Sequence, residues 1–136
     1  MSEENVDRVR RGYEAFNRDG PEAILEFLDQ GIEWHTPEED VQRGEPYVGH
    51  DGVLEFWRLY MDEFADIQIT PEEILDGGDC VLVFSENRAR GKLSGVPVEI
   101  RDAHLWRHSP EGLATSLHMF LNRERAVQAA GLTDDQ

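Results

Sequence analysis

A histidine and an aspartate stand two positions apart in the second half of the chain, at Asp102 and His104. The residues around them, Val96 to His108, alternate in polarity as a β-strand does, and side chains two apart on a strand share one face. A carboxylate beside an imidazole stabilises the protonated ring, which suits proton transfer near neutral pH. His104 is therefore a candidate acid–base, oriented by Asp102. The other interpretation is a core imidazole held by a hydroxyl or a backbone carbonyl, with Asp102 partnering an arginine.

Large aromatic side chains could form the walls of a binding pocket around this pair. Five of them fall on predicted regular elements. One lies on a short strand, three lie on a helix, and one lies on the strand face that carries His104. In that order they are Trp34, Trp57, Tyr60, Phe64 and Trp106. Because aromatic side chains dominate the cores of small domains, simple packing explains them equally well.

The sequence offers no metal or phosphate motif. The five histidines form no compact ligand pattern with an acid, and Cys80 is the only cysteine, so neither a zinc-binding pair of thiols nor an intrachain disulfide can form. No glycine-rich phosphate loop or nucleophile elbow is present. We therefore expect neither a metal nor a cofactor.

The negative net charge of the chain limits the kinds of molecule that it can bind. The chain has 13 Lys plus Arg against 29 Asp plus Glu, a formal charge of −16, which repels phosphate backbones and anionic lipids. We expect no nucleic acid and no membrane as partner, and a small apolar molecule as ligand. The charged segment Met1 to Arg11 lacks the apolar stretch of a secretion signal, so we expect a cytoplasmic location.

Periodicity predicts helices followed by strands. Apolar spacings of three and four indicate a helix at 3–18, a second short helix from Pro21 to about Gln30-Gly31, a third from Gly49 and a last one at 123–130. Alternating or β-rich runs indicate strands at 32–36, 66–75, 81–90, 96–108 and 113–121, the last four as an antiparallel meander. The polar loop 38–47 could be a lid or simply mobile.

This order predicts one α+β domain over residues 1–136, with an ordered core at about 3–132. A long amphipathic helix laid over a strongly bent sheet leaves a cavity between the two. We therefore expect a half-open cone around one apolar pocket, the usual kind of ligand site.

Several segments, in this order along the chain, resemble the SnoaL-like branch of the nuclear-transport-factor-2-like superfamily. They are Arg11-Gly12-Tyr13-Glu14-Ala15-Phe16-Asn17, Ile32-Glu33-Trp34, Tyr47 to Val53, Ala103-His104-Leu105-Trp106 and Phe120 to Leu132. The resemblance implies a cone-shaped, strongly curved, mostly antiparallel sheet wrapped around helices. Members of the superfamily include polyketide cyclases, ketosteroid isomerase, limonene epoxide hydrolase, dehydratases and domains that only bind ligands, so fold alone does not fix function.

The resemblance also implies pocket positions, at which this chain departs from the known enzymes. Where the isomerase has a helix Tyr, a strand acid and a base Asp, the alignment gives Gly12, with Tyr13 beside it, His104 and Thr36. The acid–base Asp of the cyclases aligns with Met119. The hydrolase relay of two Asp and one Arg has only Asp102 and His104 to match it.

Three functional hypotheses follow from these residues. The first is a cofactor-independent isomerase, cyclase or hydrolase that acts on a small apolar carbonyl or ring compound, with Tyr13, Thr36 and Met119 among its pocket residues. The second is a non-catalytic ligand-binding module, and the third is a dimeric scaffold. His118 and Phe120 fall on the strand face opposite Met119, so we expect a homodimer through the outer face of the sheet.

Overall fold

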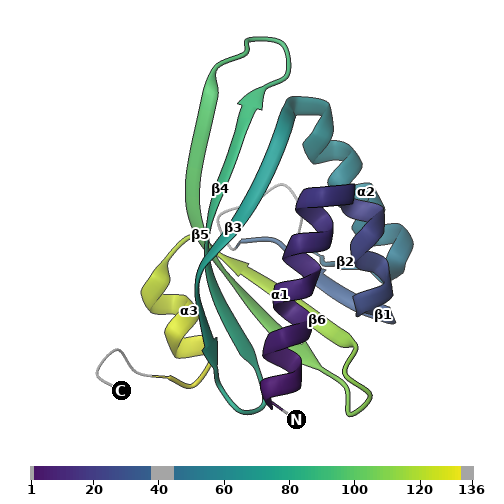
Figure 1. The fold of residues 1–136 in the computed structure, drawn as a ribbon, viewed down its shortest axis with the longest axis vertical. Coiled ribbons are helices and arrows are strands. Elements are labelled where there is room, and N and C mark those ends of the chain that lie inside the picture. Colours follow the sequence, from purple (N-terminus) through teal and green to yellow (C-terminus); the bar gives the residue numbers. More distant parts are fainter. Residues whose placement is uncertain (1, 38–44, 133–136) are drawn as a thin grey trace.

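A computed structural model describes residues 2–37 and 45–132 of the chain, and Figure 1 shows their arrangement. Most of the loop predicted as a lid, residues 38–44, lies outside the described residues. No helix among the described residues is long and apolar enough to cross a membrane.

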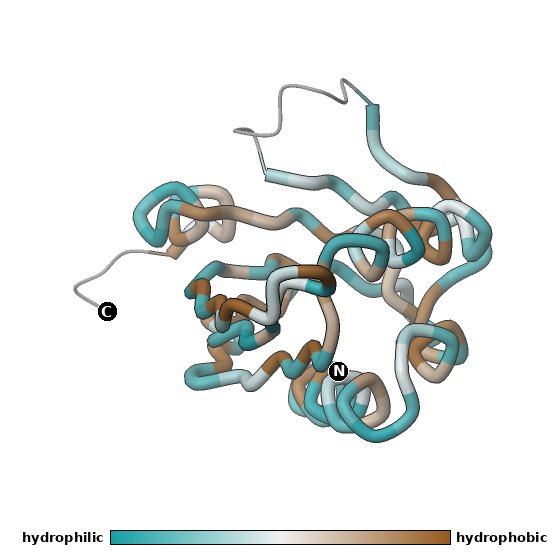
Figure 2. The backbone as a smooth tube through the Cα atoms, turned by 90° about the horizontal axis from the view of Figure 1, so that it is seen from above, coloured by the Kyte–Doolittle hydropathy of each residue, from teal (hydrophilic) through white to brown (hydrophobic). Residues whose placement is uncertain are grey.

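The elements follow the predicted order of helices and then strands. They are α1 (Ser2–Asp19), the 3-10 helix η1 (Pro21–Phe27), β1 (Leu28–His35), β2 (Tyr47–Val48), α2 (Gly49–Glu63), β3 (Phe64–Asp76), β4 (Val81–Gly91), β5 (Pro97–His108), β6 (Ala114–Phe120) and α3 (Arg123–Ala129). Along each helix, hydrophobic and hydrophilic positions alternate around the coil (Figure 2).

Two boundaries differ from the sequence prediction by more than two residues. The second helix ends at Phe27 instead of near Gln30-Gly31, and β1 begins already at Leu28. The reason is tertiary pairing: Leu28 lies opposite Ala114 on β6, and this register extends the strand into residues that have no β-branched side chain.

The six strands form one sheet in the order β2-β1-β6-β5-β4-β3. All neighbouring pairs are antiparallel except β1 and β6, which are parallel. The meander from β3 to β6 confirms the prediction, and the mixed α+β architecture with a curled sheet confirms the expected fold class.

The sheet is strongly curved, and irregular pairings occur where it bends. Register shifts interrupt β3 against β4 between Ala65 and Gln68 and between Pro71 and Glu73, and a further shift lies between Arg107 and His108 on β5. An extra residue in one strand of a pair bends that strand and increases its twist. These shifts help the long strands to wrap around α1 and α2 (Figure 1).

Each face of the sheet has its own hydrophobic cluster because residues on β4 alternate. Val81 and Val83 belong to the larger cluster on the concave face, which α1 and α2 cover, whereas Leu82 and Phe84 pack with α3 on the convex face. On the concave side, Asn17 of α1 donates to the carbonyl of Ile69 and accepts from its amide, at 2.8 and 2.9 Å. This pair of bonds fixes α1 against the edge strand β3.

Candidate active site

A cavity of about 100 Å3 lies between α1, α2 and the concave face of the sheet. Its wall is mostly apolar, and it takes residues from both helices, from η1 and from five strands. Aromatic rings pack edge to face around it: the ring centroids of Trp34 lie 6.4 Å from Trp57 and 5.9 Å from Trp106. The cavity is therefore a preformed pocket with the aromatic lining expected of a small-molecule site.

Strand alternation on β5 brings Asp102, His104 and Trp106 to this cavity. Ala103 and Leu105, between them, pack on the other face in the cluster under α3. His104 is only 5% exposed, and its Nε2 lies 3.1 Å from Oδ2 of Asp102. Ser85, the neighbour of Asp102 on β4, donates its hydroxyl to Oδ1 of the same carboxylate at 2.7 Å.

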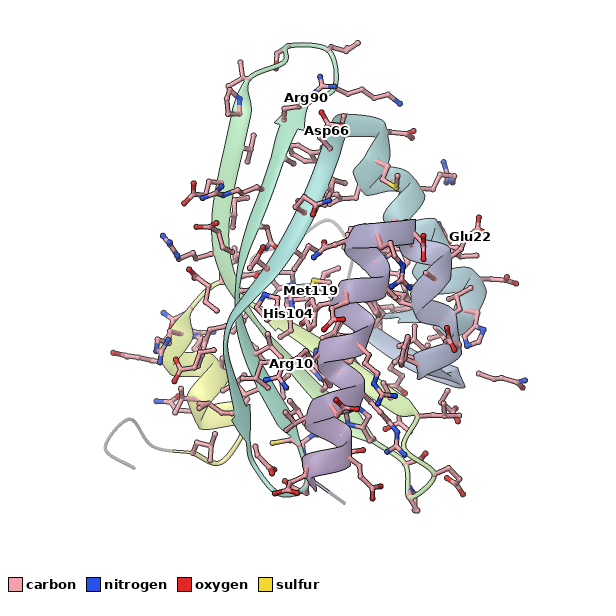
Figure 3. All side chains as sticks on the ribbon, viewed as in Figure 1. Arg10, Glu22, Asp66, Arg90, His104 and Met119 are labelled. Carbon is pink, nitrogen blue, oxygen red and sulfur yellow. The ribbon has the colours of Figure 1, made fainter. Side chains whose placement is uncertain are left out.

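The second ring nitrogen of His104 is bound by a residue from the first helix. The hydroxyl of Tyr13 lies 2.6 Å from Nδ1 of His104, and the two rings are nearly parallel. The indole Nε1 of Trp106 donates to the Tyr13 oxygen at 3.1 Å. Figure 3 shows His104 and Met119 close together behind α1, in agreement with their pairing across β5 and β6.

One arrangement of protons satisfies every bond in this network. An ionised Asp102 can only accept hydrogen bonds, so Nε2 of His104 carries a proton and donates it to the carboxylate. In a neutral ring Nδ1 then accepts, and the hydroxyl of Tyr13 donates to it. The result is a continuous chain from Asp102 through His104 to Tyr13, comparable to a serine triad with a phenol in place of the serine.

The pKa directions agree with an ionised Asp102 and a protonated Tyr13. Burial alone would raise the pKa of Asp102, but the charge that His104 carries when protonated and its hydrogen bond, together with bonds from Ser85 and Asn87, lower the pKa below its ordinary value. Burial raises the pKa of Tyr13 far above that of a free phenol, and the nearby carboxylate of Asp102 adds to the shift. At neutral pH Asp102 is therefore charged and Tyr13 is protonated.

The cavity wall also contains buried polar atoms that lack a partner within the described residues. They are Nε1 of Trp34, Nε1 of Trp57, Oδ1 of Asn87 and Nδ1 of His108, and all four residues line the cavity. An unpaired buried polar group costs about 1–3 kcal/mol, so such groups concentrate where a ligand completes the bonding.

The structure brings most of the predicted pocket residues together. Eight of the ten, namely Tyr13, Trp34, Trp57, Tyr60, Asp102, His104, Trp106 and Met119, line the one cavity. The other two do not. Thr36 lies past the end of β1 at His35, and Phe64 is the first residue of β3, where its ring packs on Tyr60 at 4.9 Å between centroids.

Sequence reasoning missed four polar residues of the site. Ser85 and Asn87 hold Asp102, and Arg8 and His108 line the other end of the cavity. The alternation of β4 and β5 was the available signal: Ser85 lies opposite Asp102, and His108 shares the strand face of His104.

The outer, convex face of the sheet exposes less of Phe120 and His118 than the sequence led us to expect. The Phe120 side chain is partly buried, because it packs against the hydrophobic cluster under α3. His118 is partly buried and stacks on His35, with ring centroids 3.9 Å apart. The apolar part of the proposed dimer surface is therefore smaller than expected.

Comparison with known proteins gives a consistent family and fold. Residues 9–117 match the model of the SnoaL-like domain family. No match was found among curated proteins.

Solved structures resemble nearly the whole chain. An NTF2-like protein of unknown function from Burkholderia pseudomallei K96243 has 25% identity and a TM-score of 0.76, covering 91% of this chain and 95% of that one. A candidate SnoaL-like polyketide cyclase from Jannaschia sp. CCS1 has 18% identity and a TM-score of 0.76, covering 96% and 92%. A protein with a ketosteroid isomerase-like fold from Catenulispora acidiphila DSM 44928, in complex with trimethylamine, has 16% identity and a TM-score of 0.71, covering 95% of each chain.

Proposed function

The chain belongs to the SnoaL-like domain family, and from that premise we propose that it is an acid–base enzyme. It moves a proton on a small, largely apolar carbonyl or ring compound, as an isomerase, cyclase or hydrolase does, and it needs no cofactor. The observation that carries the proposal is the buried chain of hydrogen bonds from Asp102 through His104 to Tyr13, which ends at an apolar cavity.

Tyr13 is the group of this chain that meets the substrate. Both ring nitrogens of His104 are already bound, one by Asp102 and one by Tyr13, so His104 acts through the phenol. The Tyr13 oxygen keeps a lone pair available beside its bond from Trp106. A substrate proton can therefore reach the relay at the oxygen of Tyr13.

The proton step is balanced within the relay. The Tyr13 oxygen takes a proton from a carbon beside the substrate carbonyl while its own proton passes to Nδ1 of His104. The C–H electron pair becomes an enolate, and the new imidazolium is stabilised by the carboxylate of Asp102. Reversal at a different substrate atom completes an isomerisation without net oxidation.

Burial favours this concerted route over one through a free phenolate. Because burial holds the pKa of Tyr13 far above its ordinary value, an isolated tyrosinate is costly in this pocket. In the relay the phenol gains one proton as it loses another, so it never carries a full charge. The ion pair of His104 and Asp102 holds the charge instead, 3.1 Å from donor to acceptor.

The size of the cavity limits the substrate. An apolar cavity of about 150 Å3 accepts benzene. The cavity of this protein, at about 100 Å3, is smaller and limits the substrate to a compound with a single small ring. The aromatic walls favour a planar, apolar body over a flexible polar one.

The test is proton exchange on a simple ketone. Cyclopentanone in D2O is followed by proton NMR for loss of the signal beside its carbonyl, with and without protein. We expect the wild type to accelerate the exchange, Y13F and H104Q to lose the acceleration, and H118Q, which alters a histidine outside the cavity, to keep it. An H104Q variant that folds and exchanges as fast as the wild type would rule out the relay.

The alternative function is a binding module. The observation that favours it is that every polar atom of the relay already has a partner within the protein, as in a structural network. Binding of cyclopentanone without any acceleration of exchange in the wild type would support this alternative.

Two wider expectations belong to the same proposal. We propose a cytoplasmic location, where the single, buried Cys80 would stay reduced.

We also propose a homodimer through the convex face of the sheet. Arg101 on that face pairs with Glu72 and Glu86 at 3.0 Å, and such mixed charges can pair with their own copies across a two-fold axis.

A further inference from the structure

The cavity has a second polar end, which the acid–base relay does not use. Asp102 and His108 both line it and stand six residues apart on β5, about 20 Å at roughly 3.3 Å per residue. Along α1, Arg8 and Tyr13 also line it, five residues or about 7.5 Å apart. The residues that line the cavity therefore extend along β5 and α1, with the relay toward one end of this row and Arg8 with His108 toward the other.

Arg8 reaches this end because a glycine leaves room for it. A Cβ atom at Gly112, in the turn between β5 and β6, would come within 2.1 Å of the guanidinium Nη1 of Arg8. Gly112 also has a φ of +90°, a conformation that other residues rarely adopt. The guanidinium thus lies directly against the turn that follows His108.

Most hydrogen-bond donors of Arg8 remain available. Within the described residues, its Nη1 donates to Oδ1 of Asn5 at 3.1 Å, and its Nη2 lies 3.8 Å from the carboxylate of Glu4, a long distance for an ion pair. A guanidinium has five N–H donors in a planar fork that matches a carboxylate. Arg8 can therefore bind a carboxylate without breaking a short ion pair.

His108 adds a neutral polar group at the same end. Its Nδ1 is buried and has no partner among the described residues. Burial, followed by the charge of Arg8, lowers the pKa of His108 to about 4, so the ring is neutral at pH 7. A neutral imidazole can present a donor or an acceptor, depending on its tautomer.

The charges along the cavity make the two ends different. Among the described residues that line it, Arg8 is the one Lys or Arg and Asp102 the one Asp or Glu. Asp102 is engaged by His104 and Ser85, whereas the polar contacts of Arg8 within residues 2–37 and 45–132 are those with Asn5 and Glu4. In a chain with a net charge of −16, this cation is the feature of the pocket that attracts an anion.

We propose that Arg8 and His108 bind the carboxylate of a planar, single-ring ligand whose opposite end reaches Tyr13. The inference rests on the proposed function in one respect only, that Tyr13 meets the reacting end of the ligand. The ligand class is an aromatic or cyclic carboxylic acid with a hydroxyl or carbonyl group across the ring. The cavity between the two ends supplies the apolar walls for the ring.

The test compares two probes that share a ring and a shape and differ in one group, a charged carboxylate against a neutral amide. 4-Hydroxybenzoate and 4-hydroxybenzamide have the same ring and nearly the same shape, and calorimetric titration measures the binding of each. We expect the wild type to bind the acid at least about tenfold more tightly than the amide, because a charge-assisted bidentate bond is about twice as strong as a neutral one. This ratio should fall to about one in R8Q.

The matched control is R11Q. Arg11 also lies on α1, but its side chain is 67% exposed, it pairs with Asp7 at 2.8 Å, and it does not line the cavity. R11Q removes the same charge from the same helix and should keep the preference of the wild type. A second measurement needs no variant: added salt should weaken binding of the acid to the wild type while leaving the amide nearly unchanged.

The outcomes separate this inference from the relay. Equal binding of both probes by the wild type, no binding of the acid, or equal loss of preference in R8Q and R11Q would each overturn it. H104Q should keep the preference for the acid even though it loses proton exchange. If R8Q loses the preference while H104Q still exchanges protons, the carboxylate site stands and the relay is wrong.

Discussion

Replacing Tyr13 by Phe tests whether the relay exists in the folded protein. The change removes one oxygen and keeps the ring in the core. It leaves Nδ1 of His104, at a residue only 5% exposed, without its donor, and it removes the acceptor of the Trp106 indole. An unpaired buried acceptor costs about 1–3 kcal/mol and the lost indole bond about 1 kcal/mol, so we expect a loss of about 2–4 kcal/mol of unfolding free energy.

The assay is urea unfolding at pH 7 followed by circular dichroism, with a thermal melt beside it. For a domain of this length, about 3–4 °C of Tm accompanies each kcal/mol, which predicts a fall of about 6–16 °C. Y60F is the matched control, because the Tyr60 ring lines the same cavity and its hydroxyl makes no hydrogen bond within the described residues. Y60F should change stability by less than about 0.5 kcal/mol. Equal stability of the two variants would refute the hydrogen-bond assignment.

Four further outcomes follow from the same structure. The folded pKa of Asp102 is lowered, so its contribution to stability is present above about pH 4 and lost below it; D102N should show a shallower loss between pH 4 and 2 in urea titrations. The pKa of His108 is lowered to about 4, so the unfolded chain binds the proton first and stability falls as pH drops from about 6.5 to 4; H108Q should flatten this slope. Leu82 is fully buried away from the cavity, and L82A should cost about 2–5 kcal/mol in urea unfolding while the acid-to-amide binding ratio stays that of the wild type. Light scattering should give a mass near twice 15.6 kDa, and reversing the charge of Arg101 should lower it, whereas a wild-type monomer would contradict the proposed dimer.

The sequence predicted the order of elements because the local signals agree with the tertiary contacts. The helices predicted from apolar residues at helical spacing are present in the fold. So are the alternating strands, which Gly-rich turns separate. The early start of β1 at Leu28 could not be predicted in this way, since that segment becomes a strand through its parallel pairing with β6, more than 80 residues away in sequence.

The pocket was predictable in part for the same reason. Alternation alone puts Asp102, His104 and Trp106 on one face, and the structure agrees. The bond from Tyr13 to His104 spans 91 residues, so no local pattern could reveal it. Nor could a pattern reveal that Gly112 makes room for Arg8, which depends on how the β5 to β6 turn meets α1.

The position of Tyr13 could not be settled by the alignment alone. The alignment puts Gly12 where the isomerase has its helix tyrosine, yet both Gly12 and Tyr13 line the cavity. A rotation of about 100° per helical residue still allows a long side chain to reach the same space. Tyr13 therefore reaches His104 from the position next to the one that the alignment indicates.

The most direct measurement of the central claim is nitrogen-15 NMR of labelled histidine in the wild type and in Y13F. The relay requires that His104 at neutral pH carries its proton on Nε2, and that Nδ1 shows the shift of a hydrogen-bonded acceptor that changes when the Tyr13 hydroxyl is removed. A His104 ring protonated on Nδ1 alone, or an Nδ1 signal that Y13F leaves unchanged, would contradict the account.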